Sequence, residues 1–393
     1  MRILFLTSQL PYPPKSGGLI KSWRLLEHLS KDHELTLVHP LKKVDLPFLE
    51  EFRKEGLPLK AHHHELVDRP RSAIGLMRAY LGHRSLNIYR NHSKVLMQRV
   101  RDVLPNIDLI FLDHYELGQY VPKDALQKIV LHEHNAEYVM WARLREIERN
   151  PVKKLILAME SIRIAAAERA YASFSDQVWA APNDRIELEK IGVDPKKLRT
   201  TYHLGEDFMI DQPEMQFELT ERKILYVGTL TWEANVDGLL WFFEKIWPAL
   251  KSDGDLSMDI IGKNPDPRLT KSVKGDTKVR FLGFVDDLEP YYRTSRVFVV
   301  PLRFGSGIKV KLLNAMYRGI PTVTTEIGTE GLDIEEAKEI FQTSNPTLFA
   351  QHIKLLLNDR EAWEKLSKAS REKAKNYTWK QLLKNHDGHL AEL

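Results

Sequence analysis

The residues best placed to do chemistry lie in one stretch of the C-terminal half, Pro301–Met316. A buried-strand pattern there runs through Gly305-Ser306-Gly307 into a helical pattern that carries Arg303, Lys309 and Lys311 nearby. Glycines let backbone N–H groups approach an anion, a helix N-terminus adds partial positive charge, and a lysine adds a full charge. The pattern predicts a diphosphate site, although a tight strand-to-helix turn also needs such glycines.

Asn314 extends this site. It follows Lys311 by three residues, so on a helix both side chains lie on one face. A carboxamide can hydrogen-bond a ribose hydroxyl. Together with the anion site, Asn314 predicts a ligand that carries a nucleoside diphosphate.

Histidines supply a second group of candidates. His134 follows the predicted strand Ile129–His132, and spacing alone would equally allow His132. A packed loop histidine and an incidental metal-like His-x-His pair are the alternatives. For His62-His63-His64 we favour a surface strand over a metal site, because consecutive side chains seldom converge on one ion.

Two regions of the sequence, whose elements must position these residues, begin with the same pattern. At Arg2–Lys31 and again at Lys223–Leu250, an apolar strand runs through a glycine-containing loop into a helix with apolar residues at spacings of three and four. The further strand candidates are short and apolar on both faces, as parallel strands between helix layers require. They are Leu35–Val38, Leu109–Leu112, Ile129–His132, Gln177–Ala180, Met258–Ile261, Val279–Leu282, Val297–Val300 and Thr322–Thr324.

This organisation predicts an α/β protein with two Rossmann-like, doubly wound parallel-sheet domains. We expect an N-terminal domain at 1–205, a hinge at 206–221, a C-terminal domain at 222–375, and a last helix at 376–393 that docks back on the N-terminal domain. The helical pattern at Val152–Phe174 is expected to pack on the first sheet rather than to lie on a membrane.

Composition narrows the class of protein. The chain has 393 residues, 43% hydrophobic and 28% charged, with no cysteine and no apolar run near the roughly 18 residues of a membrane span. We therefore expect a cytoplasmic protein without thiolate metal sites. From Arg69 to Arg101 there are eight Lys or Arg residues and no acid. This basic zone fits anionic lipid headgroups or a phosphorylated acceptor, and equally a solvated helical face; no nucleic-acid module accompanies it.

Five motifs together resemble the donor domain of family 4 retaining glycosyltransferases, which have the GT-B fold, with two such domains facing a central cleft. The resemblance includes a branch with a Gly-Ser-Gly-Ile-Lys loop and extends to the loop Pro11–Gly18. The motifs are Val227–Leu230, Ile260–Lys263, Arg280–Val285, Pro301–Met316 and Arg318–Thr324.

The resemblance assigns roles to residues. Gly17 and Gly18 would face the donor phosphates, and His134 would contact the transferred sugar. The other donor-binding positions that it implies are Gly228, Thr229, Lys263, Phe284, Val285, Arg303, Ser306, Gly307, Ile308, Lys309, Lys311 and Asn314, with the backbone near Phe284 and Val285 reading the base.

The sequence departs from the family pattern at two places. The family's glutamate pair falls on Ser306 and Asn314, and its diphosphate-binding Arg and Lys fall on Thr229 and, approximately, Asn235. A neutral amide at Asn314 costs about 1 kcal/mol relative to a charged contact. In the Gly-Ser-Gly-Ile-Lys branch, lysines of the loop and Arg303 would take over the phosphates.

The sequence thus predicts a retaining hexosyltransferase that uses a UDP- or GDP-sugar and a lipid-linked or polysaccharide acceptor. No metal or other cofactor is expected, because no Asp-x-Asp motif follows a strand. We expect it at the inner face of the membrane. The alternative is a catalytically weakened nucleotide-sugar-binding or scaffold protein; a dinucleotide-dependent oxidoreductase is disfavoured, since neither half has Gly-x-Gly-x-x-Gly after its first strand. Trp232 is a further candidate for stacking on a sugar.

Overall fold

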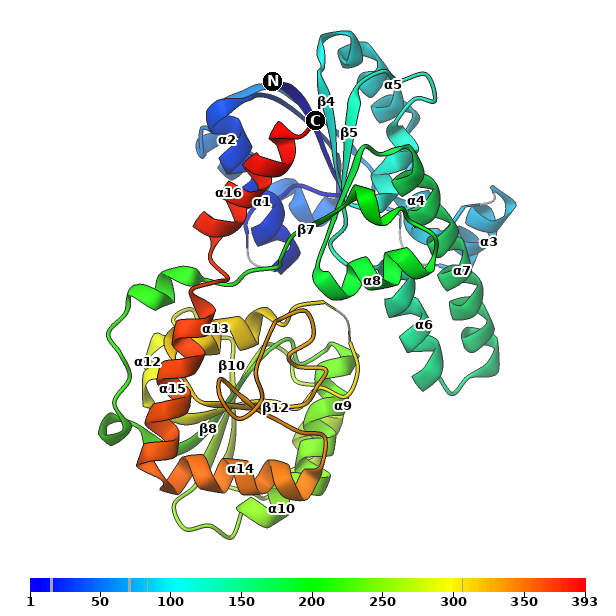
Figure 1. The fold of residues 1–393 in the computed structure, drawn as a ribbon. Helices are drawn as coiled ribbons and strands as arrows, with labels where there is room; N and C mark the ends of the chain where they lie inside the picture. Colours follow the sequence, from blue (N-terminus) through cyan, green and yellow to red (C-terminus); the bar gives the residue numbers. More distant parts are fainter. Residues whose placement is uncertain (15–16, 70–71, 83, 306) are drawn as a thin grey trace. The chain divides into compact units, whose positions relative to one another are not determined.

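The computed structural model describes residues 1–14, 17–69, 72–82, 84–305 and 307–393, with the side chain of Ile147 left out. The chain forms two compact units, Met1–His203 with Leu382–Leu393 (unit 1) and Leu204–Gln381 (unit 2) (Figure 1). Among the described residues, no helix combines the length and the apolar character that crossing a bilayer requires.

Unit 1 is built on a parallel sheet in the order β3-β2-β1-β4-β5-β6-β7. Its strands are β1 (Arg2–Thr7), β2 (Glu34–Leu41), β3 (Leu59–Leu66), β4 (Leu109–Asp113), β5 (Lys128–His132), β6 (Gln177–Ala180) and β7 (Leu198–Thr200). Its α-helices are α1 (Gly17–Asp32), α2 (Leu49–Lys54), α3 (Ala73–Leu81), α4 (Leu86–Arg90), α5 (Lys94–Val103), α6 (Glu137–Ile147), α7 (Pro151–Phe174) and α8 (Pro182–Lys190).

Alternate residues of these strands enter two cores, one on each face of the sheet. Ile3 and Phe5 of β1 pack with α1 and α2, whereas Leu4 and Leu6 pack with α5 and α7. Leu390 of the last helix, α16 (Trp379–Ala391), belongs to the first of these cores. This doubly wound arrangement confirms the α/β prediction for unit 1.

The end of α16 is held to unit 1 by polar contacts as well. Asp387 lies 2.7 Å from His28 Nε2, and the His389 carbonyl accepts a 2.7 Å hydrogen bond from Gln177. The His386 ring stacks on the indole of Trp179 with centroids 4.4 Å apart. The last helix therefore completes the fold of the N-terminal unit.

Unit 2 has a parallel sheet in the order β10-β9-β8-β11-β12-β13. Its strands are β8 (Glu221–Val227), β9 (Ser257–Ile261), β10 (Val279–Gly283), β11 (Ser295–Val300), β12 (Thr322–Thr324) and β13 (Phe341–Gln342). Its α-helices are α9 (Glu233–Trp241), α10 (Trp247–Leu250), α11 (Pro267–Ser272), α12 (Glu289–Thr294), α13 (Val310–Arg318), α14 (Pro346–Asn358) and α15 (Arg360–Ala374). The second predicted Rossmann-like domain is thereby confirmed.

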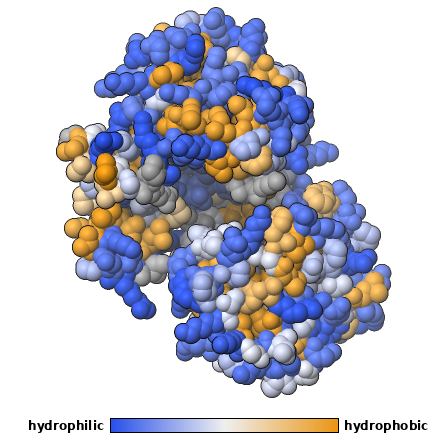
Figure 2. All heavy atoms as spheres, turned by 180° about the vertical axis from the view of Figure 1, so that it is seen from behind, coloured by the Kyte–Doolittle hydropathy of each residue, from blue (hydrophilic) through white to orange (hydrophobic). Residues whose placement is uncertain are grey.

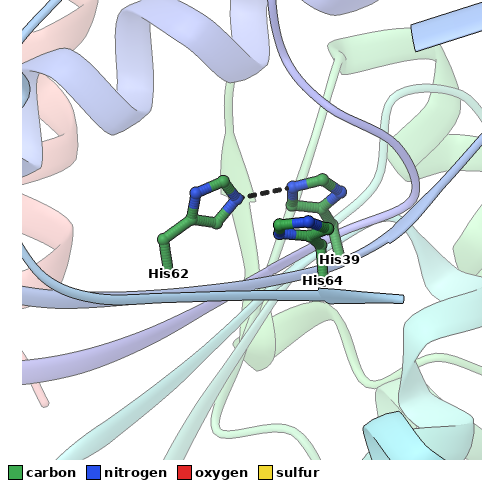
Figure 3. Close-up of side chains that lie close together, drawn as sticks. All are labelled: His39, His62 and His64. Carbon is green, nitrogen blue, oxygen red and sulfur yellow. Dashed lines mark hydrogen bonds between the residues drawn. The ribbon is translucent and has the colours of Figure 1, made fainter. Parts of the chain in front are cut away.

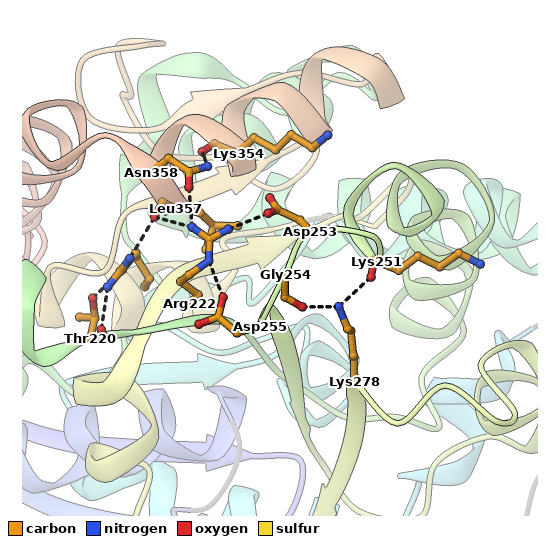
Figure 4. Close-up of polar contacts among 11 residues, drawn as sticks. Thr220, Arg222, Lys251, Asp253, Gly254, Asp255, Lys278, Lys354, Leu357 and Asn358 are labelled. Carbon is orange, nitrogen blue, oxygen red and sulfur yellow. Dashed lines mark hydrogen bonds and ion pairs between the residues drawn. The ribbon is translucent and has the colours of Figure 1, made fainter.

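A polar cluster closes the amino edge of this second sheet (Figure 4). Arg222 of β8 forms ion pairs of 2.8 Å with Asp253 and with Asp255, and it also donates to Asn358 at the end of α14. These contacts tie the start of β8 to a turn and a helix that are distant in sequence. They lie at the edge opposite the carboxyl ends of the strands, where ligands bind in such sheets.

Helix α7 differs from its expected packing. Leu155 and Ile162 are exposed by 62% and 71%, whereas Glu160 and Glu168 are buried. The carboxylates are buried because they accept backbone hydrogen bonds: Glu160 from Leu86 N at 2.8 Å and Glu168 from Glu137 N at 2.6 Å. Packing was expected for the helical pattern at Val152–Phe174, and it holds for Ile164 and Ala172 but not for these two exposed apolar residues.

Candidate active site

Lys311 brings a cation to the carboxyl end of β8. Its Nζ donates to Tyr226 Oη at 2.9 Å and to Asn235 Oδ1 at 2.6 Å. A Cβ atom at Gly228 would lie 2.9 Å from this nitrogen, so a glycine there leaves the ammonium room beside the backbone. Burial, and then the charge of Lys309, lower the pKa of Lys311 to about 7.

Asn235 links Lys311 to the backbone that follows β8. Asn235 holds the Thr229 carbonyl through a 2.9 Å hydrogen bond from Nδ2, while its Oδ1 accepts from Lys311. Lys311 of α13 therefore brings a cation next to the segment that follows β8. Sequence spacing alone could not show this approach of α13 to β8.

The loop before α13 holds two further cations, each with an acidic neighbour. Lys309 is buried, its Nζ donates to the Gly307 carbonyl, and it lies 3.5 Å from Glu330. Arg303 donates through Nε to Asp237 of α9 at 2.8 Å. Both cations are thus held in place by carboxylates of unit 2.

The remaining loop residues have different surroundings. Gly307 has a φ of 72°, in the region that favours glycine, and Ile308 is 7% exposed. Ser306 lies outside the described residues. Trp232 is 40% exposed, and its ring carbon Cη2 lies 3.6 Å from where a Cβ of Gly305 would be, so the indole stands next to the glycine loop.

Lys263 and Phe284 meet after β9 and β10. The Lys263 ammonium lies 3.9 Å from the centroid of the Phe284 ring, a cation–π contact. Phe284 is 58% exposed, and the neighbouring Val285 is half-buried. An exposed ring at a carboxyl edge is a surface on which a base can stack.

Asn314 contacts the segment that enters unit 2. Its Oδ1 accepts a hydrogen bond from Glu206 N at 2.9 Å, and a Cβ at Gly205 would lie 1.9 Å from that oxygen. One acceptor of the predicted ribose-binding amide is therefore engaged by the protein itself.

In unit 1, Asp113 at the end of β4 is the centre of a buried hydrogen-bond network. Its Oδ1 lies 2.8 Å from His132 Nδ1 and 2.7 Å from His134 Nε2. Its Oδ2 accepts from Thr7 at 3.1 Å and from Ser22 of α1 at 2.5 Å. Burial would raise the pKa of Asp113, but these histidines hold it well below its usual range.

His134 lies beside Gly18, at the start of α1. Burial lowers its pKa to about 4, so the ring is neutral, and its Nε2 faces the ionised Asp113. Nε2 therefore carries the proton and Nδ1 is an acceptor. Nδ1 is buried, has no hydrogen-bond partner among the described residues, and lies 3.5 Å from where a Cβ of Gly18 would be.

His114 adds strain to this centre. Its φ of 128° lies in a region that side chains rarely occupy, and its ring stacks on His134 with centroids 3.7 Å apart. Such backbone geometry costs on the order of 1–3 kcal/mol and clusters at functional sites. The side chain of His203 holds the backbone of His134, because its Nε2 lies 2.7 Å from the His134 carbonyl oxygen.

A cavity of about 190 Å³ adjoins His134 and is lined by acidic and amide side chains. Burial raises the pKa of Glu116 to about 7 and that of Glu133 well above its ordinary value. The lining residues are Asn87, His114, Tyr115, Glu116, Glu133, His134, Asn135 and Glu137. Convergent carboxylates and amides of this kind suit the hydroxyl groups of a polar ligand.

Asp113, His114 and Lys21 were not predicted from the sequence. The first two directly follow a predicted strand, and polar residues at the carboxyl end of a parallel strand are a usable signal. Lys21, on α1, is buried with its Nζ unpartnered among the described residues, and burial lowers its pKa to about 7. It looks like an ordinary helix position in the sequence, so no local signal marks it.

Comparisons with known proteins indicate what the chain is similar to. Residues 221–359, within unit 2, match the family model for glycosyl transferases group 1. An uncharacterized 44.6 kDa protein in the cps region of Klebsiella pneumoniae is 24% identical over 361 residues, 90% of each chain.

Solved structures share the fold over the whole chain. HepE from Anabaena, in complex with UDP and glucose, has a TM-score of 0.68 at 13% identity and full coverage of both chains. Sucrose-phosphate synthase from Thermosynechococcus elongatus has a TM-score of 0.68 at 15% identity, covering 100% of this chain and 98% of the other. The predicted class, two Rossmann-like domains as in GT-B glycosyltransferases, is confirmed; membership of family 4 stays a prediction.

Proposed function

We propose that this chain is a retaining, metal-independent hexosyltransferase of family 4. It would move a sugar from a UDP- or GDP-sugar to a hydroxyl of a lipid-linked or polysaccharide acceptor. The observation that carries the proposal is the Lys311 ammonium beside Gly228 at the carboxyl end of β8. A half-buried cation next to backbone without a side chain is suited to a diphosphate.

The donor would be held by unit 2. Lys311 and the N-terminus of α13 would stabilise the charge that develops on the departing diphosphate, which is the main requirement of this chemistry. Phe284 would stack on the base and Asn314 would contact the ribose. UDP in the structure of HepE supports a UDP-linked donor.

In unit 1, His134 would accept a hydrogen bond from the sugar through its unprotonated Nδ1, and Gly17 and Gly18 would let the donor approach that nitrogen. The acceptor hydroxyl would attack the anomeric carbon on the face from which the diphosphate leaves. The C–O bond to the phosphate breaks with its electrons on the phosphate oxygen, and the hydroxyl proton passes to that oxygen. The acidic cavity beside His134 would hold the acceptor's hydroxyl groups.

Contact with an anionic membrane is a further part of the proposal. Figure 2 shows apolar side chains gathered at several places on the molecular surface. On α3, the residues Ile74, Met77 and Leu81 form an apolar stripe, and their exposed fractions are 60%, 58% and 75%. Arg78 is exposed beside them. An apolar stripe beside a cation suits the surface of an anionic bilayer, and the cps-region relative fits a polysaccharide acceptor.

The basic residues of 69–101 fall into two groups: some form hydrogen bonds within the fold, and others are exposed. Arg69 donates to the Tyr89 carbonyl at 2.6 Å, and Arg90 donates to the Arg69 carbonyl at 2.8 Å. Lys94 and Arg99 are exposed on α5. Part of this zone therefore stabilises the local fold, and the exposed part remains for lipid headgroups or an anionic acceptor.

A calorimetric screen of UDP, GDP, ADP and their sugar conjugates, with and without EDTA, tests the donor side. We expect one nucleoside diphosphate to bind preferentially and equally well in EDTA. Binding without any turnover would favour the alternative, a nucleotide-sugar-binding or scaffold protein; absence of binding to every nucleotide would contradict both.

A further inference from the structure

Three histidines from two adjacent strands converge at the edge of the unit 1 sheet (Figure 3). His39 belongs to β2, and His62 and His64 belong to β3. The parallel register pairs His39 with His64 and Leu37 with His62, so the three rings project from one face. One nitrogen from each ring lies within 4.8 Å of the other two.

His39 is held as a ligand with its lone pair toward the other rings. Its Nδ1 lies 3.0 Å from the Pro40 carbonyl, which can only accept, so Nδ1 carries the proton. The ring is fully buried, and the contact of Nδ1 with the carbonyl leaves Nε2 as its acceptor nitrogen. A backbone carbonyl that orients the second nitrogen is the usual support of a metal-binding histidine.

His62 and His64 complete the arrangement. His62 Nε2 lies 2.9 Å from His39 Nε2, and its ring packs edge-on against Phe52 of α2 with centroids 5.0 Å apart. Nδ1 of His64 is buried without a hydrogen-bond partner among the described residues. Both rings are half-buried and lie on the same face of the sheet as His39.

One positive charge stands nearby. The charge of Arg53 of α2 acts on both His62 and His64, but its side chain is half exposed and forms an ion pair with Glu50. Solvent and that carboxylate screen the guanidinium, so it weakens a cation site without blocking it.

We propose that His39, His62 and His64 form a site for a transition metal ion of the Zn²⁺ type, with water as the fourth ligand. Three imidazoles without a carboxylate select Zn²⁺, Ni²⁺ or Cu²⁺ over Mg²⁺ and Ca²⁺. Zn–N bonds of about 2.0–2.1 Å at tetrahedral angles place nitrogens about 3.4 Å apart. Binding therefore requires the proton of His62 to move from Nε2, which faces His39 Nε2, to Nδ1, together with small rotations of the half-buried His62 and His64 rings. The ion would clamp the edge strand β3 to β2.

This site is separate from the proposed transfer chemistry. In the order β3-β2-β1-β4-β5, the strands β2 and β3 stand apart from β4 and β5, which carry Asp113 and lead to His134. The inference does not depend on the proposed function, because its measurements are of metal binding alone.

The test uses the full chain without a polyhistidine tag, stripped with EDTA and dialysed, and titrated with ZnCl₂ by calorimetry. Co²⁺ absorption then reports the ligand geometry. His63 is the matched control: it lies between the two β3 ligands, pairs with Val38, and faces Arg99 and Asp102 on the opposite side of the sheet.

We expect one Zn²⁺ per chain in the wild type and in His63→Ala, and at least tenfold weaker binding in His62→Ala, His64→Ala and His39→Asn. The His39→Asn change keeps a donor for the Pro40 carbonyl and removes Nε2. If circular dichroism shows that this variant does not fold, the variants at His62 and His64, which are half-buried on β3, test the proposal. The proposal is overturned if Zn²⁺ does not bind, or if His63→Ala binds it as weakly as His62→Ala. It is also overturned if tight binding is lost only in His132→Ala, because that residue belongs to the separate Asp113 network.

Discussion

Replacing Lys311 with methionine removes the ammonium beside Gly228 and keeps the length of the side chain. In the proposed donor complex this group makes a charge-assisted contact with a phosphate, worth about 1.5–3 kcal/mol. Because the pKa of Lys311 is about 7, half of these groups are charged at pH 7, and charging the rest costs about 0.4 kcal/mol. The Kd for the preferred nucleoside diphosphate should therefore rise about 10- to 100-fold at pH 7.

The same residue predicts a pH dependence. A bound diphosphate favours charged Lys311, so binding takes up a proton when pH exceeds the pKa of the free protein. The affinity should accordingly fall by up to about tenfold per pH unit between pH 7 and 8.5. Tyr226, which contacts the ammonium, stays neutral because burial raises its pKa. Arginine stays charged throughout this range, so Lys311→Arg should flatten the profile.

Titration calorimetry in EDTA at pH 6.5, 7.5 and 8.5 measures both effects. Lys365→Met, on the exposed face of α15 in the same unit, is the matched control and should bind like the wild type. Wild-type affinity in Lys311→Met, or an unchanged pH profile in Lys311→Arg, would refute the role given to this lysine.

Four further predictions each concern the replacement of one residue. Asp113→Asn should lower the free energy of unfolding of unit 1 by about 2–4 kcal/mol in urea titrations, because it breaks a buried charged network; a loss below 1 kcal/mol would contradict that network. Asn314→Ala should raise the nucleotide Kd about fivefold by calorimetry, and an unchanged Kd would leave this amide only its contact with Glu206. Arg222→Met should cost unit 2 about 1–2 kcal/mol in the same urea assay without changing nucleotide affinity, and weaker binding would tie the amino edge to the site. Met77→Ser should weaken sedimentation with phosphatidylglycerol vesicles about tenfold, whereas equal binding would remove α3 from the membrane surface.

The sequence predicted the strands well because most are buried on both faces. Val, Ile and Leu runs such as Leu109–Leu112 and Val297–Val300 leave little choice of structure. The edge strand β3 is less apolar and was anticipated only as a surface strand at His62–His64. Periodicity was wrong on α7, where buried glutamates that cap neighbouring backbone amides occupy the face that hydrophobic spacing would assign to apolar residues.

The site was predictable only where the chemistry is local. The loop before α13 and the histidine after β5 are visible as motifs. The contact of Lys311 with Asn235, the Asp113 network and the convergence of His39 with His62 depend on tertiary structure, because each joins residues from different elements. A prediction from one sequence has no access to such pairings.

The measurement that tests the central claim most directly is proton NMR of the preferred nucleotide sugar during turnover, with water or glycerol as acceptor. The account predicts that the wild type releases the nucleoside diphosphate and a sugar product with the anomeric configuration of the donor. His134→Ala should bind the nucleotide almost unchanged and release no sugar. An inverted product, or a wild-type protein that binds the donor and never turns it over, would contradict the account.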